Sequence, residues 1–240
     1  MDLKVLGSSS KGNCYILDNG SEALMIEAGV DFKRIKKALN FDLAKLVGCV
    51  ISHEHKDHSR CVDDVLNAGI RTLALPSVFE TSKNKIFARV IEIGKGYKLG
   101  NFKIMPFDVR HDVPCVGYLI SHPDLGRLLF ATDTASIDYS FKSLSHILIE
   151  ANFADDILQG RIDSGHVPAA MRSRLYHTHM ELQTTKQILK SMDLSSVDLI
   201  LLIHLSDGSS DEDRFVQEIK EATGRMVLAA HDNMTINLNY

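Results

Sequence analysis

The sequence predicts an α+β domain in which two β-sheets pack face to face, with helices on their outer surfaces. Short strand-like runs dominate the first half of the chain, and a β-rich meander occupies its middle. In the second half, strands alternate with longer helix-like segments. Because no linker, low-complexity tract or short-period repeat separates the halves, we expect residues 1–240 to form a single domain.

The spacing of apolar residues predicts each element in turn. The strands expected in the first half cover residues 3–6, 14–17, 23–26, 49–52, 72–75 and 90–93, with helices over 32–39 and 58–68. The meander comprises residues 97–108, 116–121 and 127–131. The second half is expected to contain strands over 146–149, 197–202 and 225–229, a helix after Glu181 and a helix over 211–222.

Composition limits the setting. Hydrophobic residues make up 45% of the chain and charged residues 24%, which are ordinary globular values. No apolar run approaches the roughly 20 residues of a membrane helix, and the first residues lack a signal-peptide pattern, so we expect a cytoplasmic protein without a membrane partner. A net charge of −4 argues against a broad basic surface, although a local phosphate site stays open.

The cysteines indicate a reduced protein. They are scattered and form no C-x-x-C pair, so we expect buried thiols rather than disulfides or metal ligands. The residues concerned are Cys14, Cys49, Cys61 and Cys115.

The most informative segment is H-E-H-K-D-H, which holds His53, His55, Asp57 and His58 directly after an apolar run over residues 46–52. Alternate residues of an extended segment point the same way, and His58 joins the others if a helix begins there. Three imidazoles and a carboxylate exceed what one four-coordinate zinc needs, since that ion also keeps a position for water. The motif therefore predicts two divalent metal ions, either Zn or Mn.

Further donors follow other strand-like runs. His111, Asp133 and His204 each come at the end of an apolar segment, where a scaffold fixes polar side chains while leaving them accessible. Asp133 could bridge both ions with its two oxygens. His231, which follows residues 227–230, is the alternative to His204 as the metal-ligating histidine nearest the C-terminal end.

These residues together resemble the metallo-β-lactamase superfamily. The resemblance implies a four-layer αββα sandwich with the metals at one edge of the sheets. It assigns His53, His55 and His111 to the first metal, and Asp57, His58 and His204 to the second, with Asp133 between them. Four segments further resemble a small bacterial and phage branch that includes 5′-to-3′ DNA exonucleases, and they lie at residues 6–14, 111–118, 149–152 and 203–206.

This branch resembles larger nucleases, of the ribonuclease J and cleavage-factor type, in which an acidic residue pairs with a His facing the scissile phosphate. Glu150 and His179 match that pair, with neighbouring His177 as the competitor. His179 would donate a proton to the leaving oxygen, Glu150 would orient it, and Asp57 could accept a proton from the nucleophilic water. The interval between Asp133 and His179 is too short for an inserted RNA-clamping domain, so we expect an open site.

Substrate contacts are expected on two segments. The loop between Gly7 and Asn13 carries hydroxyl and backbone groups suited to a phosphate, although such a loop is often only a turn. A basic cluster before His179 could follow a nucleic-acid backbone, whereas the basic residues of helix 32–39 are expected to be a solvated face. The expected substrate-binding residues are Ser8, Ser9, Ser10, Asn13, Arg172 and Arg174.

The favoured function is therefore hydrolysis of nucleic-acid phosphodiesters by a hydroxide held between two metals, as a DNA exonuclease that needs no readable protein partner. A second hypothesis keeps the metals but changes the substrate to a lactone, thioester or cyclic nucleotide, because the fold serves many reactions. A third is a binding protein with a vestigial site, which the complete set of ligand candidates disfavours.

Overall fold

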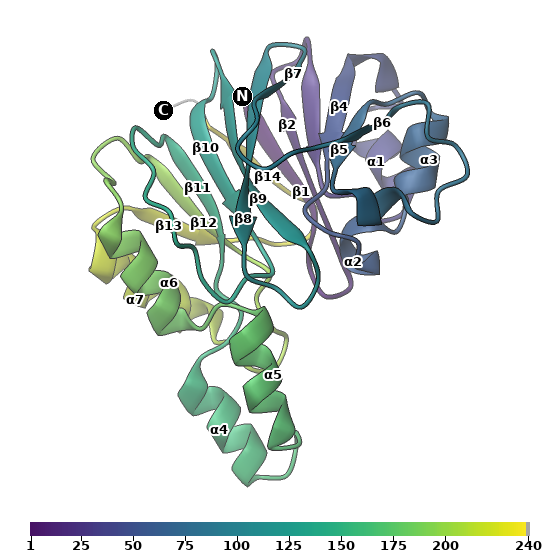
Figure 1. The fold of residues 1–240 in the computed structure, drawn as a ribbon. Helices are drawn as coiled ribbons and strands as arrows, with labels where there is room; N and C mark the ends of the chain where they lie inside the picture. Colours follow the sequence, from purple (N-terminus) through teal and green to yellow (C-terminus); the bar gives the residue numbers. More distant parts are fainter. Residues whose placement is uncertain (239–240) are drawn as a thin grey trace.

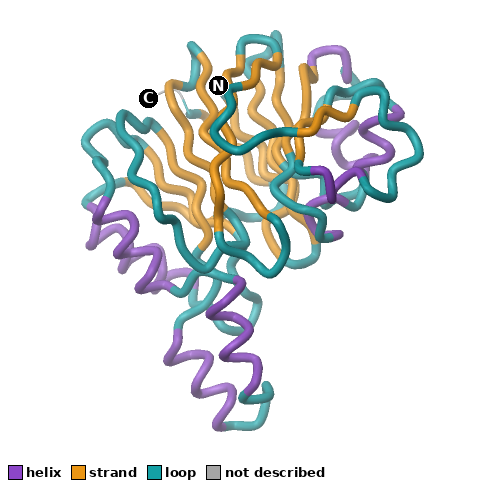
Figure 2. Tube along the Cα trace, in the orientation of Figure 1, coloured by secondary structure: helices purple, strands orange, loops and turns teal. Residues whose placement is uncertain are grey.

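The computed structural model describes residues 1–238, which form two mixed seven-stranded sheets (Figures 1 and 2). The first sheet has the order β14 (Met234–Asn237), β1 (Asp2–Ser9), β2 (Gly12–Asp18), β3 (Ala23–Ile26), β4 (Leu46–Val50), β5 (Thr72–Ala74) and β6 (Ala88–Val90). The second has the order β13 (Met226–Ala229), β12 (Leu199–Ile203), β11 (His146–Glu150), β10 (Gly126–Ala131), β9 (Cys115–His122), β8 (Phe102–Val109) and β7 (Tyr97–Leu99).

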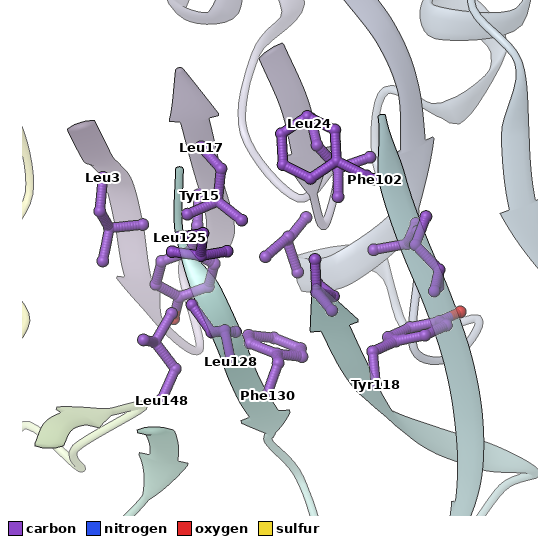
Figure 3. Packing of buried hydrophobic residues seen from close by; sticks show 14 of the residues in the cluster. Leu3, Tyr15, Leu17, Leu24, Phe102, Tyr118, Leu125, Leu128, Phe130 and Leu148 are labelled. Carbon is purple, nitrogen blue, oxygen red and sulfur yellow. The ribbon is translucent and has the colours of Figure 1, made fainter. Parts of the chain in front are cut away.

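The two sheets bury their facing surfaces against each other. Large side chains from both sheets fill this layer, among them Leu3 and Tyr15 of the first sheet and Phe102, Tyr118 and Phe130 of the second (Figure 3). Tyr15 and Phe130 meet edge to face across the layer, with ring centroids 5.6 Å apart. Each such fully buried side chain contributes about 1.5–3 kcal/mol to folding, so this layer fixes how the sheets lie on each other.

Helices cover both outer faces. Ile35 of α1 (Phe32–Ala38) and Val65 of α3 (Val62–Asn67) belong to one outer core cluster, on the first sheet. Leu189 of α6 (Leu182–Ser191) and Phe215 of α7 (Glu212–Thr223) belong to the other, on the second sheet. The result is the αββα order of layers seen in Figure 1. The short elements are α2 (Lys56–Ser59) and two 3₁₀ turns, η1 (Leu43–Lys45) and η2 (Pro76–Phe79).

The predicted fold class is confirmed, and the predicted strands and helices recur with small shifts. The helix expected at 58–68 is divided into α2 and α3. The strand expected at 90–93 was placed too late in the chain, because β6 covers Ala88–Val90. Strand β14, which pairs with β1, was not predicted. All four cysteines are free and buried, as expected.

A helical hairpin lies between β11 and α6 and was also not predicted. It consists of α4 (Asp155–Asp163) and α5 (Ala170–Thr178) and extends away from the sandwich in Figure 1. Each helix buries a single residue, Leu158 in α4 and Thr178 in α5. Without a continuous apolar stripe, neither helix produces the 3.6-residue pattern by which helices are recognised in a sequence.

Candidate metal centre

The H-E-H-K-D-H motif lies where β4 ends and the chain turns into α2. His53 and His55 are on the extended part, and the helix starts at Lys56, directly after His55. The amide of His58 donates to the carbonyl of His55 at 2.9 Å, which closes the first turn. The turn brings His58 into one donor group with His53, and Asp57 into another with His58.

One group of donors consists of His53, His55 and His111, whose ligand atoms all lie within 4.8 Å of one another. His111 follows β8 in the second sheet. Its Nδ1 donates to the carbonyl of Thr178 at 2.9 Å, so its Nε2 is the atom that faces His55 Nδ1, at 3.3 Å. Nδ1 of His53 lies 2.9 Å from Ser52 Oγ, so its Nε2 is likewise the free ring nitrogen.

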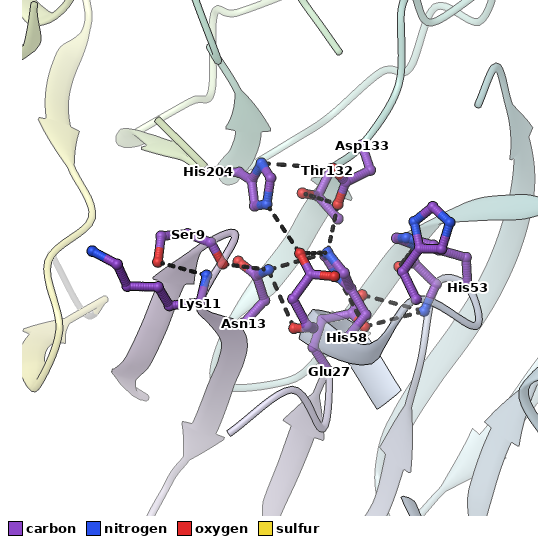
Figure 4. Close-up of polar contacts among 12 residues, drawn as sticks. Ser9, Lys11, Asn13, Glu27, His53, His58, Thr132, Asp133 and His204 are labelled. Atoms are coloured by element: carbon purple, nitrogen blue, oxygen red, sulfur yellow. Dashed lines mark hydrogen bonds and ion pairs between the residues drawn. The ribbon is translucent and has the colours of Figure 1, made fainter. Parts of the chain in front are cut away.

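A second group consists of Asp57, His58 and His204, again within 4.8 Å of one another. Nε2 of His58 lies 2.6 Å from Asp133 Oδ2 and 3.4 Å from Asp57 Oδ2 (Figure 4). Asp133 also groups with His53 and with His204. It therefore lies between the two groups, as the bridging role expected for it requires.

The backbone is unusual at this edge of the sheets. Glu27, Asp133 and His204 have φ angles of 65°, 47° and 55°, in the left-handed region that residues other than glycine rarely adopt. Such conformations cost about 1–3 kcal/mol each and persist only where the surroundings impose them. Their concentration in one cluster of polar residues indicates a functional site.

The free donor atoms fit metal ions. Nε2 of His53 and Nε2 of His204 are buried and have no hydrogen-bond partner among residues 1–238. Buried polar atoms rarely lack a partner, so each such atom needs an explanation. Burial lowers the pKa of His53 well below its usual range and favours the neutral imidazole, which is the form that binds metal. A set of imidazoles and carboxylates suits Zn or Mn.

Opposite charges stabilise one another in the rest of the cluster. Burial disfavours the charged form of His58, but the carboxylates of Asp133 and Glu27 outweigh it and raise its pKa well above the usual range. Burial likewise opposes ionisation of Asp133, yet His204 and His58 hold its pKa well below the usual range. Asp133 is thus held in its ionised form, which is the form that binds metal.

Glu150 and His179 lie beside this centre. Nδ1 of His179 is 2.7 Å from Glu150 Oε1 and 3.1 Å from Asp133 Oδ1. Glu150 is fully buried, and its Oε2 accepts hydrogen bonds from the amides of Thr134 and Met180. Burial of His179 opposes its charge, but Glu150 and Asp133 raise its pKa to about 10. His179 also lines a cavity of about 210 Å³ together with Asp57 and Asp133.

The competing histidines lie elsewhere. His177 is exposed, and its Nδ1 lies 2.6 Å from the carbonyl of Ser173 in its own helix. His231 is exposed and pairs with Glu212 at 3.0 Å. Neither belongs to any of the donor groups.

The residues expected to bind substrate at the ends of β1 and β2 and in the turn between them have different roles. Ser8 Oγ accepts a hydrogen bond from the amide of His204 at 3.0 Å, and Nδ2 of Asn13 lies 3.1 Å from His58 Nε2. Both side chains are buried and hold metal-ligand candidates. Ser9 Oγ accepts from the amide of Lys11. Ser10 is exposed and lines the cavity beside His179.

The two arginines expected to contact substrate also differ. Arg174 lines the cavity that contains His179. The guanidinium of Arg172 instead bonds Asp155 at 2.6 Å and Gln159 at 2.7 Å, and it lies over the ring of Tyr176. Arg172 therefore ties α5 to α4.

Two residues of the site were missed from the sequence. Glu27 follows β3 and lies 3.4 Å from His58 Nδ1, fully buried. Asn152 follows β11, and its Nδ2 lies 3.2 Å from His204 Nδ1 and donates to the His204 carbonyl. Both stand at the ends of buried strands, the signal that selected Asp133, so the same criterion could have found them.

The comparisons with known proteins agree with this geometry. A family profile described as Beta-lactamase superfamily domain matches residues 23–205, so the chain belongs to that family. The superfamily comprises metal-dependent hydrolases, and the donor groups described above are candidate sites for divalent metals. None of the helices within residues 1–238 is long and apolar enough to cross a membrane.

Among curated relatives, the exodeoxyribonuclease WalJ of Streptococcus pneumoniae is 25% identical over 193 residues, which cover 74% of this chain and 72% of WalJ. Among solved structures, the metallo-β-lactamase fold protein YhfI of Bacillus subtilis has a TM-score of 0.73 at 17% identity, covering 98% of this chain and 99% of YhfI. The short form of human tRNase Z has a TM-score of 0.67 at 14% identity, with 99% of each chain covered. The structural neighbours support the fold.

Proposed function

We propose that this protein is a metal-dependent phosphodiesterase that hydrolyses nucleic acid, and specifically a DNA exonuclease. The observation that carries the proposal is the Glu150 and His179 pair beside the two donor groups. An activated ester or a thioester releases a weakly basic group that leaves without a proton, whereas an alkoxide leaving from a phosphodiester needs a proton donor. The relationship to WalJ supports DNA as the substrate.

The metal ions would be two in number, Zn or Mn, held by His53, His55 and His111 on one side and by Asp57, His58 and His204 on the other, with Asp133 shared. When bound, such ions supply an activated water and neutralise charge on the phosphate. Asp57 would also accept a proton from the attacking water. These are the ligand assignments that the resemblance to the superfamily implies.

The proton for the leaving oxygen would come from His179. Its Nδ1 is engaged by Glu150 and Asp133, so Nε2 is the ring nitrogen left to reach a phosphodiester oxygen in the cavity. Glu150 acts as a positioning residue, because backbone amides hold its Oε2 while its Oε1 contacts the imidazole. Ser10 and Arg174 line the same cavity and would contact the strand.

The test is hydrolysis of end-labelled DNA and RNA, single- and double-stranded, by purified protein loaded with Mn or Zn. We expect mononucleotides released progressively from one end of DNA, and little product from RNA. Cleavage of internal positions in circular DNA would contradict the exonuclease assignment. Turnover of lactones, thioesters or cyclic nucleotides without turnover of polynucleotides would replace it with a small-molecule hydrolase.

A further inference from the structure

A second cavity of about 610 Å³ lies against the metal centre. It shares Ser10, Arg174, His179 and His204 with the smaller cavity described above, so the two are continuous. Its other walls are the α4–α5 hairpin and the loop at residues 205–208, which follows His204. A ligand whose reacting group lies at His179 would therefore extend along this cavity.

The lining of this second cavity carries positive charges that are not paired with carboxylates. Arg161 of α4 and Arg174 of α5 both line it, and neither guanidinium has a carboxylate partner among the ion pairs of residues 1–238. Asp207 is the carboxylate among the lining residues, and Lys11 neutralises it at 2.7 Å. Arg172, by contrast, faces its own hairpin and pairs with Asp155. Two uncompensated cations beside a phosphodiester centre favour an anionic ligand.

The position of Arg161 depends on Gly208. A Cβ atom at this glycine would lie 2.0 Å from Arg161 Nη1 and 2.6 Å from its Cζ, so the guanidinium rests directly on the glycine. Nη1 also donates to Ser209 Oγ at 3.3 Å. The loop after the metal-ligand candidate His204 thus holds Arg161 in the cavity wall. No such contact would be needed if Arg161 were only a solvated surface residue.

We propose that this second cavity is a subsite for a phosphate of the substrate strand next to the scissile one, with Arg161 and Arg174 as its ligands. The inference rests on the proposed function. Arginine is suited to this role because its planar guanidinium can give two parallel hydrogen bonds to a phosphate. Such contacts fix register without reading sequence. They also explain how a chain of net charge −4 holds a polyanion locally.

The test measures binding without hydrolysis. The probe is a fluorescent DNA hexamer with uncharged methylphosphonate linkages, made with a 5′ phosphate, with a 3′ phosphate or with neither, and titrated by anisotropy into metal-loaded protein. We expect one phosphorylated form to bind about 10- to 100-fold more tightly than the form without phosphate, the worth of a few charge-assisted hydrogen bonds. The end that shows the gain identifies the polarity of the strand.

Variants connect the gain to the cavity. Arg161→Gln and Arg174→Gln should each remove most of the gain, and Arg161→Lys should restore part of it. Gly208→Ala should act like Arg161→Gln, because its Cβ displaces the flexible guanidinium rather than the backbone. Arg89→Gln is the matched control and should keep the full gain, since within residues 1–238 the Arg89 guanidinium bonds only the carbonyls of Ile86 and Ala88.

Equal binding of all three probes to the wild-type protein would overturn the subsite. A gain that survives in both the Arg161 and the Arg174 variants would also overturn it, because the phosphate would then lie on the metals. These outcomes are independent of the nuclease assay. If the phosphorylated probe binds more tightly as expected but the protein does not cleave DNA, the subsite stands and the proposed nuclease reaction is rejected.

Discussion

The two sheets of the sandwich follow the same plan but supply the candidate metal ligands differently. In each sheet the strands run antiparallel on one side and parallel on the other. The first sheet delivers His53, His55, Asp57 and His58 from one loop after β4. The second sheet delivers its donors singly, from the ends of β8, β10 and β12.

This difference indicates which half of the candidate site is more sensitive to substitution. Donors that share one loop are held by the local turn of α2, whereas His111, Asp133 and His204 meet only because strands far apart in sequence end at the same edge. The second half therefore depends on contacts from neighbouring residues, and Glu150, Asn152 and Ser8 make such contacts with His204. Substitutions in the two halves test this contrast.

Asp133→Ala should cause the largest loss, because this residue joins the donors of both halves. We expect the bound metal to fall from about two ions per chain and hydrolysis to slow by about 10⁴-fold or more, since metal ions contribute several kcal/mol to such reactions. Elemental analysis of chelator-free protein and a nuclease assay measure the two effects. His231→Ala is the control and should change neither; unchanged metal content in the Asp133 variant would reject the shared role.

His179→Ala should separate chemistry from metal binding. Both metals should stay bound, while hydrolysis of DNA slows by about 10²–10⁴-fold, the usual worth of a general acid. An aryl diester such as bis(p-nitrophenyl) phosphate needs no proton on its leaving group, so it should lose far less. Glu150→Gln should show the same selectivity more weakly.

Steady-state rates on the two substrates decide this point. Equal losses on both would mean that His179 binds phosphate or shapes the site rather than donating a proton. No loss on either would remove it from the mechanism.

Glu27→Gln and Asn152→Ala form a matched pair across the two halves. Glu27 lies against Nδ1 of His58 in the first half, and Asn152 against Nδ1 of His204 in the second. Residues that orient a metal-binding His typically contribute 10–100-fold to metal affinity, about the loss expected here. Calorimetric titration of metal-free protein with Zn or Mn measures it. The loss should be greater for Asn152, since the His204 carbonyl also depends on it.

If Glu27→Gln lowers metal affinity more than Asn152→Ala does, the second half is not the more sensitive one. Asn101→Ala is the control, because its amide bonds Glu22, away from the donor groups, at 2.6 Å.

The smallest effects concern ion networks outside the donor groups, one in each half of the molecule. In the first, burial opposes ionisation of Asp18, but hydrogen bonds from Lys4 and Lys45 outweigh it and lower its pKa from 3.8 to about 2. A carboxyl whose pKa is lowered by folding stabilises the protein above its unfolded pKa and loses that contribution as pH falls through the folded one. Asp18→Asn should therefore cost about 2 kcal/mol at pH 7 and progressively less between pH 4 and pH 2.

In the second half, hydrogen bonds from Lys186 and Arg214 lower the pKa of Glu218 from 4.5 to about 2. Its side chain is 26% exposed, against 6% for Asp18, so solvent screening reduces the expected cost of Glu218→Gln to about 1 kcal/mol. Denaturant unfolding of both variants at pH 7 and pH 3 measures the free energies. A cost that does not shrink at the lower pH would show that the ion pairs are not its source.

The layered fold class and the contiguous motif could be recognised from the sequence alone, as could the three candidate donors that stand singly. Alternating and helical apolar periods report burial directly, and a motif within six residues needs no tertiary information to bring its side chains together. His111, Asp133 and His204 could be selected because each follows an apolar strand. The choice of His179 over His177 also came from the sequence, through resemblance to a family.

The supporting residues of the site and the α4–α5 hairpin could be recognised only in the folded structure, because they depend on contacts between distant segments. Glu27 and Asn152 support ligands that are 31 and 52 residues away in the chain. The α4–α5 hairpin buries too little apolar surface to leave a periodic pattern, so its helices and the orientations of Arg161, Arg172 and Arg174 were invisible in the sequence. Charge composition shows that arginines are present, but only packing determines that Arg172 faces its own hairpin while Arg174 faces the site.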